Sequence, residues 1–136
     1  MRILILEDDI ERLAVFRREL IGHEVFCTDL AEIAIKQLED SDWDFLFLDH
    51  DLGGEVFVTK TKNTGYEVAL WLEEHSERKP NIIYLHSLNP NGRMRMKQAI
   101  PEAIEATFAW RIASKLVEDG GPDLANSLEG SLPIIK

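Results

Sequence analysis

The fold of this chain is organised around one stretch, Phe45-Leu46-Phe47-Leu48-Asp49-His50-Asp51. Its first four residues are apolar without interruption, which is typical of a central strand that is covered on both faces of a sheet. Acidic residues and a histidine follow at once, so polar side chains begin where the strand ends. We therefore expect a buried parallel strand over residues 45–48, with a polar site at its carboxyl end.

Strands and amphipathic helices alternate on both sides of this stretch. Short β-prone runs cover residues 2–6, 24–28 and 82–85, and apolar residues at helical spacing cover residues 10–21, 30–38 and 65–75. Asp29 is a candidate N-cap for the second of these helices. Strands that alternate with helices of this length form right-handed βαβ units around a parallel sheet. The pattern therefore predicts a doubly wound α/β domain.

Two segments depart from simple alternation. Residues 53–64 are too long for a tight connection, and residues 56–59 could form a small hairpin or part of a mobile flap, of which we favour the flap. Lys60 and Lys62 could reach a ligand only if this flap closes. A further helix should run from about residue 93 towards Pro101. Beyond it, apolar residues recur at every fourth position, which favours an amphipathic helix: Ile104, Phe108, Ile112 and Leu116. The alternative is a fifth strand over residues 106–110 with a last helix after it, so the sheet has four or five strands.

Composition limits the classes of function. The chain has 136 residues, the length of one domain, and its 45% hydrophobic and 29% charged residues are ordinary for a globular protein. Fifteen Lys and Arg against 25 Asp and Glu give a formal charge of −10, which disfavours a broad nucleic-acid-binding surface. No apolar run approaches the ~20 residues of a membrane helix, and Glu7 comes too early for a signal peptide. We therefore expect a cytoplasmic protein, with the single Cys27 as a buried structural thiol.

Polar residues follow three of the predicted strands directly. Ligands of doubly wound sheets bind beyond the carboxyl ends of the strands. The residues found there are Asp8 and Asp9 after the first strand, Asp49, His50 and Asp51 after the third, and His86 and Ser87 after the fourth. Segments far apart in the sequence thus converge on one edge of the sheet, which is the candidate site.

Four of these residues are acids: Asp8, Asp9, Asp49 and Asp51. Carboxylates within a few ångströms of one another repel unless a cation neutralises them. Oxygen ligands of this kind suit Mg²⁺ or Mn²⁺, which also bridge to phosphate. The sequence therefore predicts a divalent metal site formed by these four acids. Asp9 has an equally good interpretation as the N-cap of the first helix.

Two histidines, His50 and His86, lie at the same strand ends. Imidazole titrates near neutral pH, so both are candidates for the acid and base of a reaction. His86 is the stronger candidate, because His50 could instead be a packing residue beside the site. His23 and His75 lie at the opposite end of the predicted sheet, and we interpret them as structural.

A phosphate-binding site is predicted where the helix after the fourth strand begins. Residues 89–92 (Asn-Pro-Asn-Gly) lead into a helix with Arg93 in its first turn, so backbone N–H groups and a guanidinium can converge on one anion. Asn89, Arg93 and the Ser87 hydroxyl are the candidate phosphate contacts. Ser87 as a nucleophile is less favoured, because no Ser-His-acid arrangement can be recognised in the sequence. A solvated basic face is the alternative for Arg93 and the preferred interpretation for Arg95 and Lys97.

Four segments together carry a family resemblance. They are residues 6–9 (Leu-Glu-Asp-Asp), 48–53 (Leu-Asp-His-Asp-Leu-Gly), 64–68 (Thr-Gly-Tyr-Glu-Val) and 86–96 (His-Ser-Leu-Asn-Pro-Asn-Gly-Arg-Met-Arg-Met). In this order they closely resemble the cyclic-phosphate processing receiver domain family, over about residues 1–101. The resemblance implies a flavodoxin-like, receiver-like fold with Asp8 and Asp9 as metal-site acids and Asp49 at the phosphoacceptor position. Residues 102–136 lie outside it, and we expect there an extra C-terminal helix and a tail that could serve a homodimer or another partner.

The sequence departs from ordinary receivers in two respects. His86 stands where a Thr or Ser is expected, and no Lys-Pro pair follows a fifth strand. We therefore expect a metal-dependent phosphoesterase that opens a cyclic phosphate, at an RNA end or in a nucleotide. His86 and His50 would share the proton transfers, while the metal and Arg93 would stabilise the transition state. Two alternatives are phosphoryl transfer to Asp49 and a receiver-like module that binds a phosphorylated ligand or a protein partner without turnover.

Overall fold

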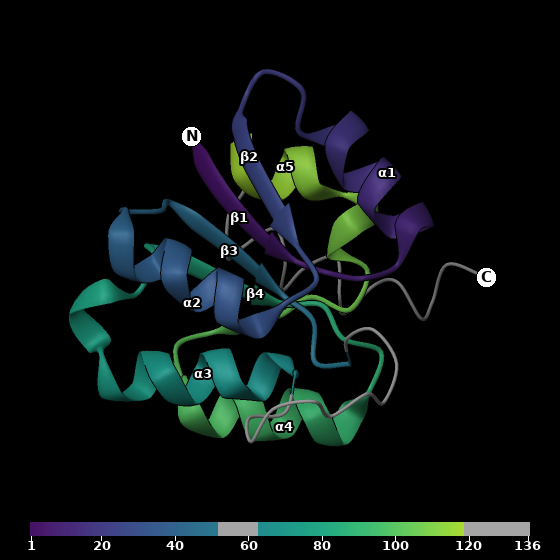
Figure 1. The fold of residues 1–136 in the computed structure, drawn as a ribbon. Coiled ribbons are helices and arrows are strands. Elements are labelled where there is room, and N and C mark those ends of the chain that lie inside the picture. The colour runs from purple at the N-terminus through teal and green to yellow at the C-terminus, as the bar shows by residue number, and fades with distance from the viewer. Residues whose placement is uncertain (52–62, 119–136) are drawn as a thin grey trace.

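In the part of the chain that the structure describes, residues 1–51 and 63–118, five parallel strands form one sheet (Figure 1). They are β1 (Arg2–Leu6), β2 (Glu24–Thr28), β3 (Phe45–Leu48), β4 (Ile82–Leu85) and β5 (Ile104–Glu105), in the spatial order β2-β1-β3-β4-β5. This order is that of flavodoxin-like sheets, which wind outwards from a switch point between β1 and β3. The structure, a computed structural model, thus confirms the predicted doubly wound sheet.

Helices cover both faces of the sheet (Figure 1). On one face lie α1 (Ile10–Glu19) and α5 (Ala113–Glu118), and on the other lie α2 (Ala31–Asp40), α3 (Gly65–Glu74) and α4 (Pro90–Ala99). Alternate residues of β1 serve the two layers, with Leu4 and Leu6 packed towards α2 and α3, and Ile3 and Ile5 packed with Phe16 of α1. Every residue of β3 is buried, as its apolar run predicts.

Side-chain caps begin two helices at the carboxyl edge of the sheet. Asp9 is the N-cap of α1, and its Oδ1 accepts a backbone N–H of the first turn at 2.9 Å. Asn89 is the N-cap of α4 and accepts the Gly92 N–H at 3.0 Å. Pro90 occupies the first helical position, where its missing N–H has no intrahelical partner to lose. The helix α4 therefore begins earlier than predicted.

The start of α2 corrects another expectation. Asp29 was predicted as the N-cap, but the N-cap is Leu30, which makes no side-chain cap bond. Instead the Ala31 N–H donates to Asn63 Oδ1 at 2.7 Å, and Asn63 Nδ2 donates to the Asp29 carbonyl at 2.9 Å. A residue distant in the sequence supplies the acceptor that a local cap would have supplied.

The C-terminal third differs most from expectation. The continuous amphipathic helix predicted from Ile104 is wrong, because β5 lies there and is followed by the 3₁₀ helix η2 (Ala109–Arg111) and by α5. The alternative interpretation placed a fifth strand at residues 106–110. A fifth strand does exist, but it lies just before that range, at Ile104–Glu105. The small residues Ala103, Ala106 and Ala109 are fully buried, and the Ala106 N–H donates to the Leu85 carbonyl at 2.9 Å. Burial of these alanines against the sheet, rather than the spacing of the large apolar residues, sets the local structure.

Some expectations lie beyond what the structure describes. The predicted flap at residues 53–64, with Lys60 and Lys62, falls almost entirely outside the described residues, as does the tail after residue 118. The short 3₁₀ helix η1 (Ser76–Arg78) connects α3 to β4. Cys27 is half-buried in β2 rather than fully buried. Among the described residues, no helix has the length and apolar character needed to cross a membrane.

Candidate active site

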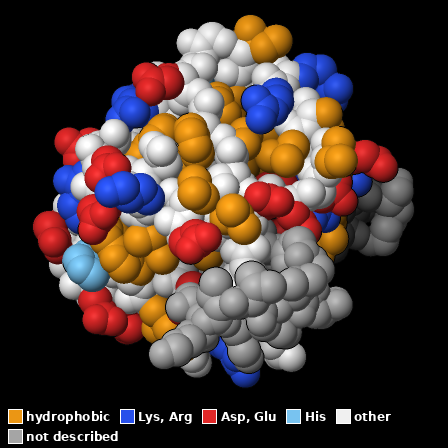
Figure 2. Space-filling model, in the orientation of Figure 1, with side chains coloured by type: hydrophobic (Ala, Val, Ile, Leu, Met, Phe, Trp, Pro, Cys, Tyr) orange, Lys and Arg blue, Asp and Glu red, His pale blue; other side chains and the backbone are white. Residues whose placement is uncertain are grey.

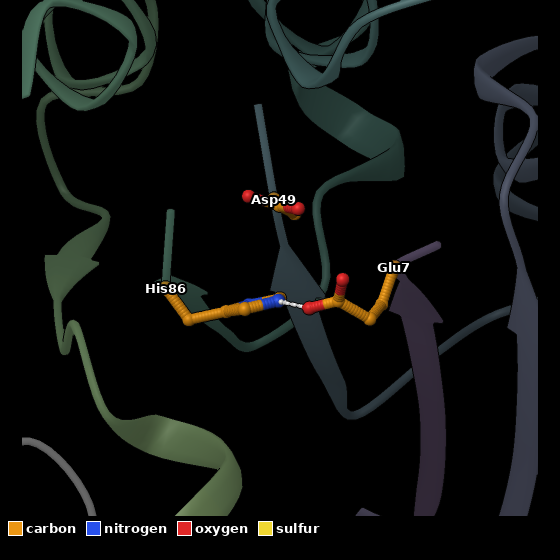
Figure 3. Close-up of side chains that lie close together, drawn as sticks. All are labelled: Glu7, Asp49 and His86. Atoms are coloured by element: carbon orange, nitrogen blue, oxygen red, sulfur yellow. Dashed lines mark hydrogen bonds and ion pairs between the residues drawn. The ribbon is translucent and has the colours of Figure 1, made fainter. Parts of the chain in front are cut away.

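The register of the sheet brings three polar side chains together at its carboxyl edge (Figure 3). Leu6 pairs with Leu48, and Leu48 pairs with Leu85, so the residues that come next in the chain lie side by side. These next residues are Glu7, Asp49 and His86. One ligand atom from each lies within 4.8 Å of the others, and all three side chains are buried.

Glu7 is surrounded by hydrogen-bond donors. Its Oε2 accepts the N–H groups of Asp8 at 3.0 Å and Asp9 at 2.9 Å, and Arg12 binds both carboxylate oxygens at 3.0 Å. His86 Nε2 lies 2.8 Å from Oε1. Burial alone would raise the pKa of Glu7, but the hydrogen bonds from His86 and Arg12 outweigh it and lower the pKa to about 2. Glu7 is therefore ionised throughout the neutral range.

Glu7 determines which nitrogen of His86 carries the proton. An ionised carboxylate only accepts hydrogen bonds, so the imidazole donates from Nε2, and Nδ1 is the unprotonated nitrogen of the neutral ring. Nδ1 is buried and has no hydrogen-bond partner among the described residues. The ring also packs edge-on against Phe16, with ring centroids 5.2 Å apart. His86 is thus held in one orientation, with Nε2 on Glu7 and Nδ1 without a partner among the described residues.

Asp49 lies beside this pair and is only 3% exposed. Its Oδ1 accepts the His50 N–H at 2.8 Å, and its Oδ2 lies 3.7 Å from Arg12 Nη2. Burial raises the pKa of Asp49 to about 6, with a further contribution from the negative charge of Glu7, although His86 and Arg12 oppose the shift. Asp49 therefore exchanges its proton close to neutral pH.

His50 belongs to a second group of side chains at the same edge. Its Nδ1 lies 2.8 Å from Asp51 Oδ1, and the same oxygen accepts Asn89 Nδ2 at 3.3 Å. Gly92 of α4 packs directly against the imidazole, because a Cβ at this position would lie 2.4 Å from His50 Cγ. The start of α4 therefore holds His50 in place.

The predicted metal ligands are only partly brought together. Among the described residues, the three-residue cluster includes Asp49 but none of the other three acids. Asp9 caps α1, Asp51 is exposed and belongs to the group around His50, and Asp8 is half-buried next to Glu7 in the chain. Metal binding by these three residues stays a prediction.

Ser87, Asn89 and Arg93, the predicted phosphate contacts, form hydrogen bonds with other residues of the protein. The Ser87 Oγ is buried and accepts the Asn89 N–H at 3.1 Å. Arg93 donates to the Ser87 carbonyl at 2.5 Å and to Glu105 Oε1 at 3.2 Å. Arg93 thus links α4 to the loop after β4 and to β5, and its role towards phosphate stays a prediction.

Two residues, Glu7 of the cluster and Arg12 beside it, were not among the site residues expected from the sequence. Glu7 is the first residue after β1, just as Asp49 and His86 are the first residues after β3 and β4. This equivalent position was the available signal, but the acids that follow Glu7 obscured it. Arg12 carried no comparable signal, because its direction depends on how α1 packs onto the sheet.

The chemistry of the cluster fits a divalent ion. Mg²⁺ and Mn²⁺ take carboxylate oxygens, and an imidazole nitrogen is more acceptable to Mn²⁺ than to Mg²⁺. Glu7 and Asp49 supply carboxylates, and the His86 imidazole lies within 4.8 Å of them. Within the described residues, Arg12 is the cation that contacts both carboxylates.

Comparison with known families agrees with these observations. Residues 3–102 match the sequence profile of the family described as "Cyclic-phosphate processing Receiver domain". The chain belongs to this family. The match extends from β1 to the end of α4. The matched region therefore contains both the three-residue cluster and the group around His50. A search of curated protein sequences gave no significant match.

Solved structures show that the receiver domain shares its fold with response regulators. A CheY-like receiver domain protein from Methanospirillum hungatei JF-1 has a TM-score of 0.63 at 17% identity, over 96% of this chain and 97% of its own. TrrA from Thermotoga maritima, solved with Mg²⁺-BeF, has a TM-score of 0.60 at 20% identity, over 87% and 97%. The Mn²⁺-bound form of response regulator Rcp1 has a TM-score of 0.56 at 17% identity, over 95% and 89%. At these identities the likeness establishes the fold alone.

Proposed function

We propose that this receiver domain hydrolyses a cyclic phosphate ester, with His86 as the proton acceptor. The family description supplies the substrate class, for which a 2′,3′-cyclic phosphate at an RNA end and a cyclic nucleotide are the two candidates. The observation that carries the proposal is the buried pair of His86 and Glu7. One imidazole nitrogen is held by an ionised carboxylate, and the other has no partner among the described residues. A base that is oriented by a third group is the arrangement that general-base catalysis requires.

In the proposed reaction, water attacks the phosphorus atom and its proton passes to His86 Nδ1. One P–O bond of the ring breaks, and the leaving oxygen takes up a proton to become a hydroxyl group. His50, which lies next to Asp49 at the same strand end, supplies that proton, because Asp49 is ionised when it binds a metal ion. The product is a phosphate monoester, formed by the net addition of one water molecule.

Positive charge at the site would stabilise the transition state. Asn89 with Arg93 remains the proposed phosphate contact at the start of α4, and a divalent ion would supply the other positive charge. Glu7 and Asp49 would hold a divalent ion, and such an ion polarises phosphoryl oxygens. The Mg²⁺ and Mn²⁺ forms of two receivers of the same fold support this choice of metal.

The proposed substrate is a small molecule or a chain end. On the face in Figure 2, acidic and apolar side chains of the described residues separate the lysines and arginines, so this face has no continuous basic stripe. The formal charge of −10 also disfavours contact with a long phosphate backbone. A single cyclic phosphate needs only a few donors at one point, which the strand ends supply.

Phosphoryl transfer to Asp49 is the second candidate function. The observation that favours it is the carboxylate of Asp49 at a strand end, 3.7 Å from the Arg12 guanidinium, in a receiver fold. In that case Asp49 forms an acyl phosphate and His86 has no essential part in the chemistry. The two candidates therefore differ in what removal of His86 does.

The test measures hydrolysis by the purified protein in Mn²⁺, in Mg²⁺ and in chelator. The substrates are adenosine 2′,3′-cyclic phosphate, an RNA oligonucleotide with a 2′,3′-cyclic end, and 3′,5′-cyclic AMP. His86→Ala should reduce turnover by about two to four orders of magnitude, the usual contribution of a general base. His23→Ala is the matched control, since His23 lies at the opposite end of the sheet and pairs with Glu118.

Thermal unfolding of each variant shows whether the fold is retained. Full turnover by His86→Ala would remove the assigned role, and no turnover of any substrate by the wild-type protein would reject the proposed function. A phosphoprotein formed from a small phosphodonor, and lost in Asp49→Asn, would instead support the second candidate.

A further inference from the structure

The Glu7 carboxylate has no accepting capacity left in this structure. A carboxylate offers about four lone-pair positions. Glu7 accepts hydrogen bonds from two backbone N–H groups, from both Nε and Nη2 of Arg12, and from His86 Nε2. A divalent ion that binds Glu7 must therefore replace at least one of these donors.

The donors around Glu7 are not equally easy to displace. The N–H groups of Asp8 and Asp9 are fixed by the turn that begins α1, and His86 is fixed by β4 and by its packing against Phe16. Arg12 reaches Glu7 through a long side chain that is 21% exposed, so it can turn towards solvent. Arg12 is also the donor that a metal ion would repel, because both carry positive charge.

The Arg12 guanidinium lies between the two carboxylates that would bind a metal ion, those of Glu7 and Asp49. Its Nη2 lies 3.0 Å from Glu7 Oε2 and 3.7 Å from Asp49 Oδ2, so the guanidinium bridges the two carboxylates. An ion bound to the same two carboxylates would bridge them in the same way. Among the described residues, no other lysine or arginine is paired with either of them.

We propose that Arg12 is a built-in counter-ion that competes with the divalent metal for Glu7 and Asp49. Metal binding requires the guanidinium to leave the carboxylates, and loss of the metal allows it to return. The inference rests on the metal site in the proposed function. It adds that the affinity of this site for metal is set by an arginine that is not itself a ligand.

The first test measures binding of Mn²⁺ alone by calorimetry, without substrate. Arg12→Gln should bind Mn²⁺ at least about tenfold more tightly than the wild-type protein, because a unit charge within a few ångströms of the ion is removed. Arg17→Gln removes the same charge from an exposed position of α1 and is the matched control. It should change the affinity by less than about twofold, because exposed charges are screened. Equal or weaker binding by Arg12→Gln overturns the proposal.

A second measurement uses the wild-type protein, so it does not depend on whether a variant folds. In NMR spectra the Nε–H of Arg12, bonded to Glu7 at 3.0 Å, should exchange slowly with water in chelator and rapidly once Mg²⁺ is saturating. The Nε–H of Arg78, bonded to the Leu38 carbonyl at 2.9 Å, is the internal reference and should not change. An Arg12 signal that is unaffected by saturating Mg²⁺ overturns the proposal.

Neither measurement involves turnover, so the inference can fail independently of the proposed function. If no variant binds metal while cyclic phosphates are hydrolysed in chelator, the counter-ion proposal is wrong and the hydrolase proposal stands. If Mn²⁺ binds with the expected order of affinities while no cyclic phosphate is hydrolysed, the counter-ion proposal stands alone.

Discussion

Asp49→Asn should stabilise the metal-free protein at neutral pH, although it removes a carboxylate from the candidate site. Burial raises the pKa of Asp49 from 3.8 to about 6, so the folded protein holds the ionised form at a cost in free energy. Asparagine has nearly the same shape, and its oxygen can still accept the His50 N–H. The exchange therefore removes a buried charge without opening a cavity.

The size and the sign of the effect follow from proton linkage. A carboxyl with a raised pKa in the folded state stabilises the protein below its ordinary pKa of 3.8, and this contribution is lost as the pH rises through 6. A shift of about 2 pKa units corresponds to about 3 kcal/mol in the free energy of unfolding. Near pH 8 the variant should therefore be more stable than the wild-type protein by up to about 3 kcal/mol, and the gain should shrink towards zero near pH 4.

Urea unfolding in chelator at a series of pH values from 4 to 8 measures this difference. Asp42→Asn is the control, since the Asp42 side chain is 94% exposed, and it should change the free energy of unfolding by less than about 0.5 kcal/mol at every pH. A gain for Asp49→Asn that does not depend on pH would refute the reasoning. A variant less stable than the wild-type protein near pH 8 would refute it as well.

Two further substitutions probe the surroundings of Asp49. Glu7→Gln should show the opposite pH dependence, because the lowered pKa of Glu7, about 2, stabilises the protein above its ordinary pKa of 4.5. Urea unfolding should show a loss of about 3 kcal/mol near pH 7 that fades as the pH falls from 4.5 towards 2, and a loss independent of pH would indicate steric damage instead. Gly92→Ala should lower the free energy of unfolding by about 1–3 kcal/mol, because the new Cβ would lie 2.4 Å from His50 Cγ. An unchanged melting temperature for Gly92→Ala would show that α4 can move away from His50.

Most of the sheet could be predicted from the sequence because local and global signals agree there. The bounds of β1 to β4 are those expected from their apolar runs, and β3, the most apolar run, is buried throughout. The agreement ends at β5. There the buried residues are Ala103, Ala106 and Ala109. Alanine is small and only weakly hydrophobic, so its positions in the sequence do not indicate which face of an element is buried. The large apolar residues at every fourth position from Ile104 predicted a helix. Instead, Ile104 and Glu105 pair with β4 as a strand, so the spacing does not determine the structure there.

The candidate site was predictable in position but not in full composition. A residue directly after a buried parallel strand lies at the ligand-binding edge, and this rule located Asp49 and His86. Glu7 obeys the same rule, because the strand expected over residues 2–6 ends directly before it, but the two acids that follow were assigned to the site in its place. The register between β1 and β3 places Glu7 beside Asp49. Arg12 depends on the rotation of α1 about its axis, which only the packed structure defines.

The backbone at Asp49 and His50 is held between the first turns of two helices. A Cβ on Gly65 of α3 would lie 1.9 Å from the Asp49 carbonyl oxygen, and Gly92 of α4 has no more room above the His50 ring. Elsewhere in a core, the side chains of both partners can absorb a small displacement by changing rotamer, but here one partner of each contact is glycine, which has no side chain to move. A shift of a fraction of an ångström at this strand end would therefore be transmitted to α3 through the Asp49 backbone and to α4 through the His50 ring. Through these two glycines, the position of the site is coupled to the positions of α3 and α4, and so to the outer surface of the domain.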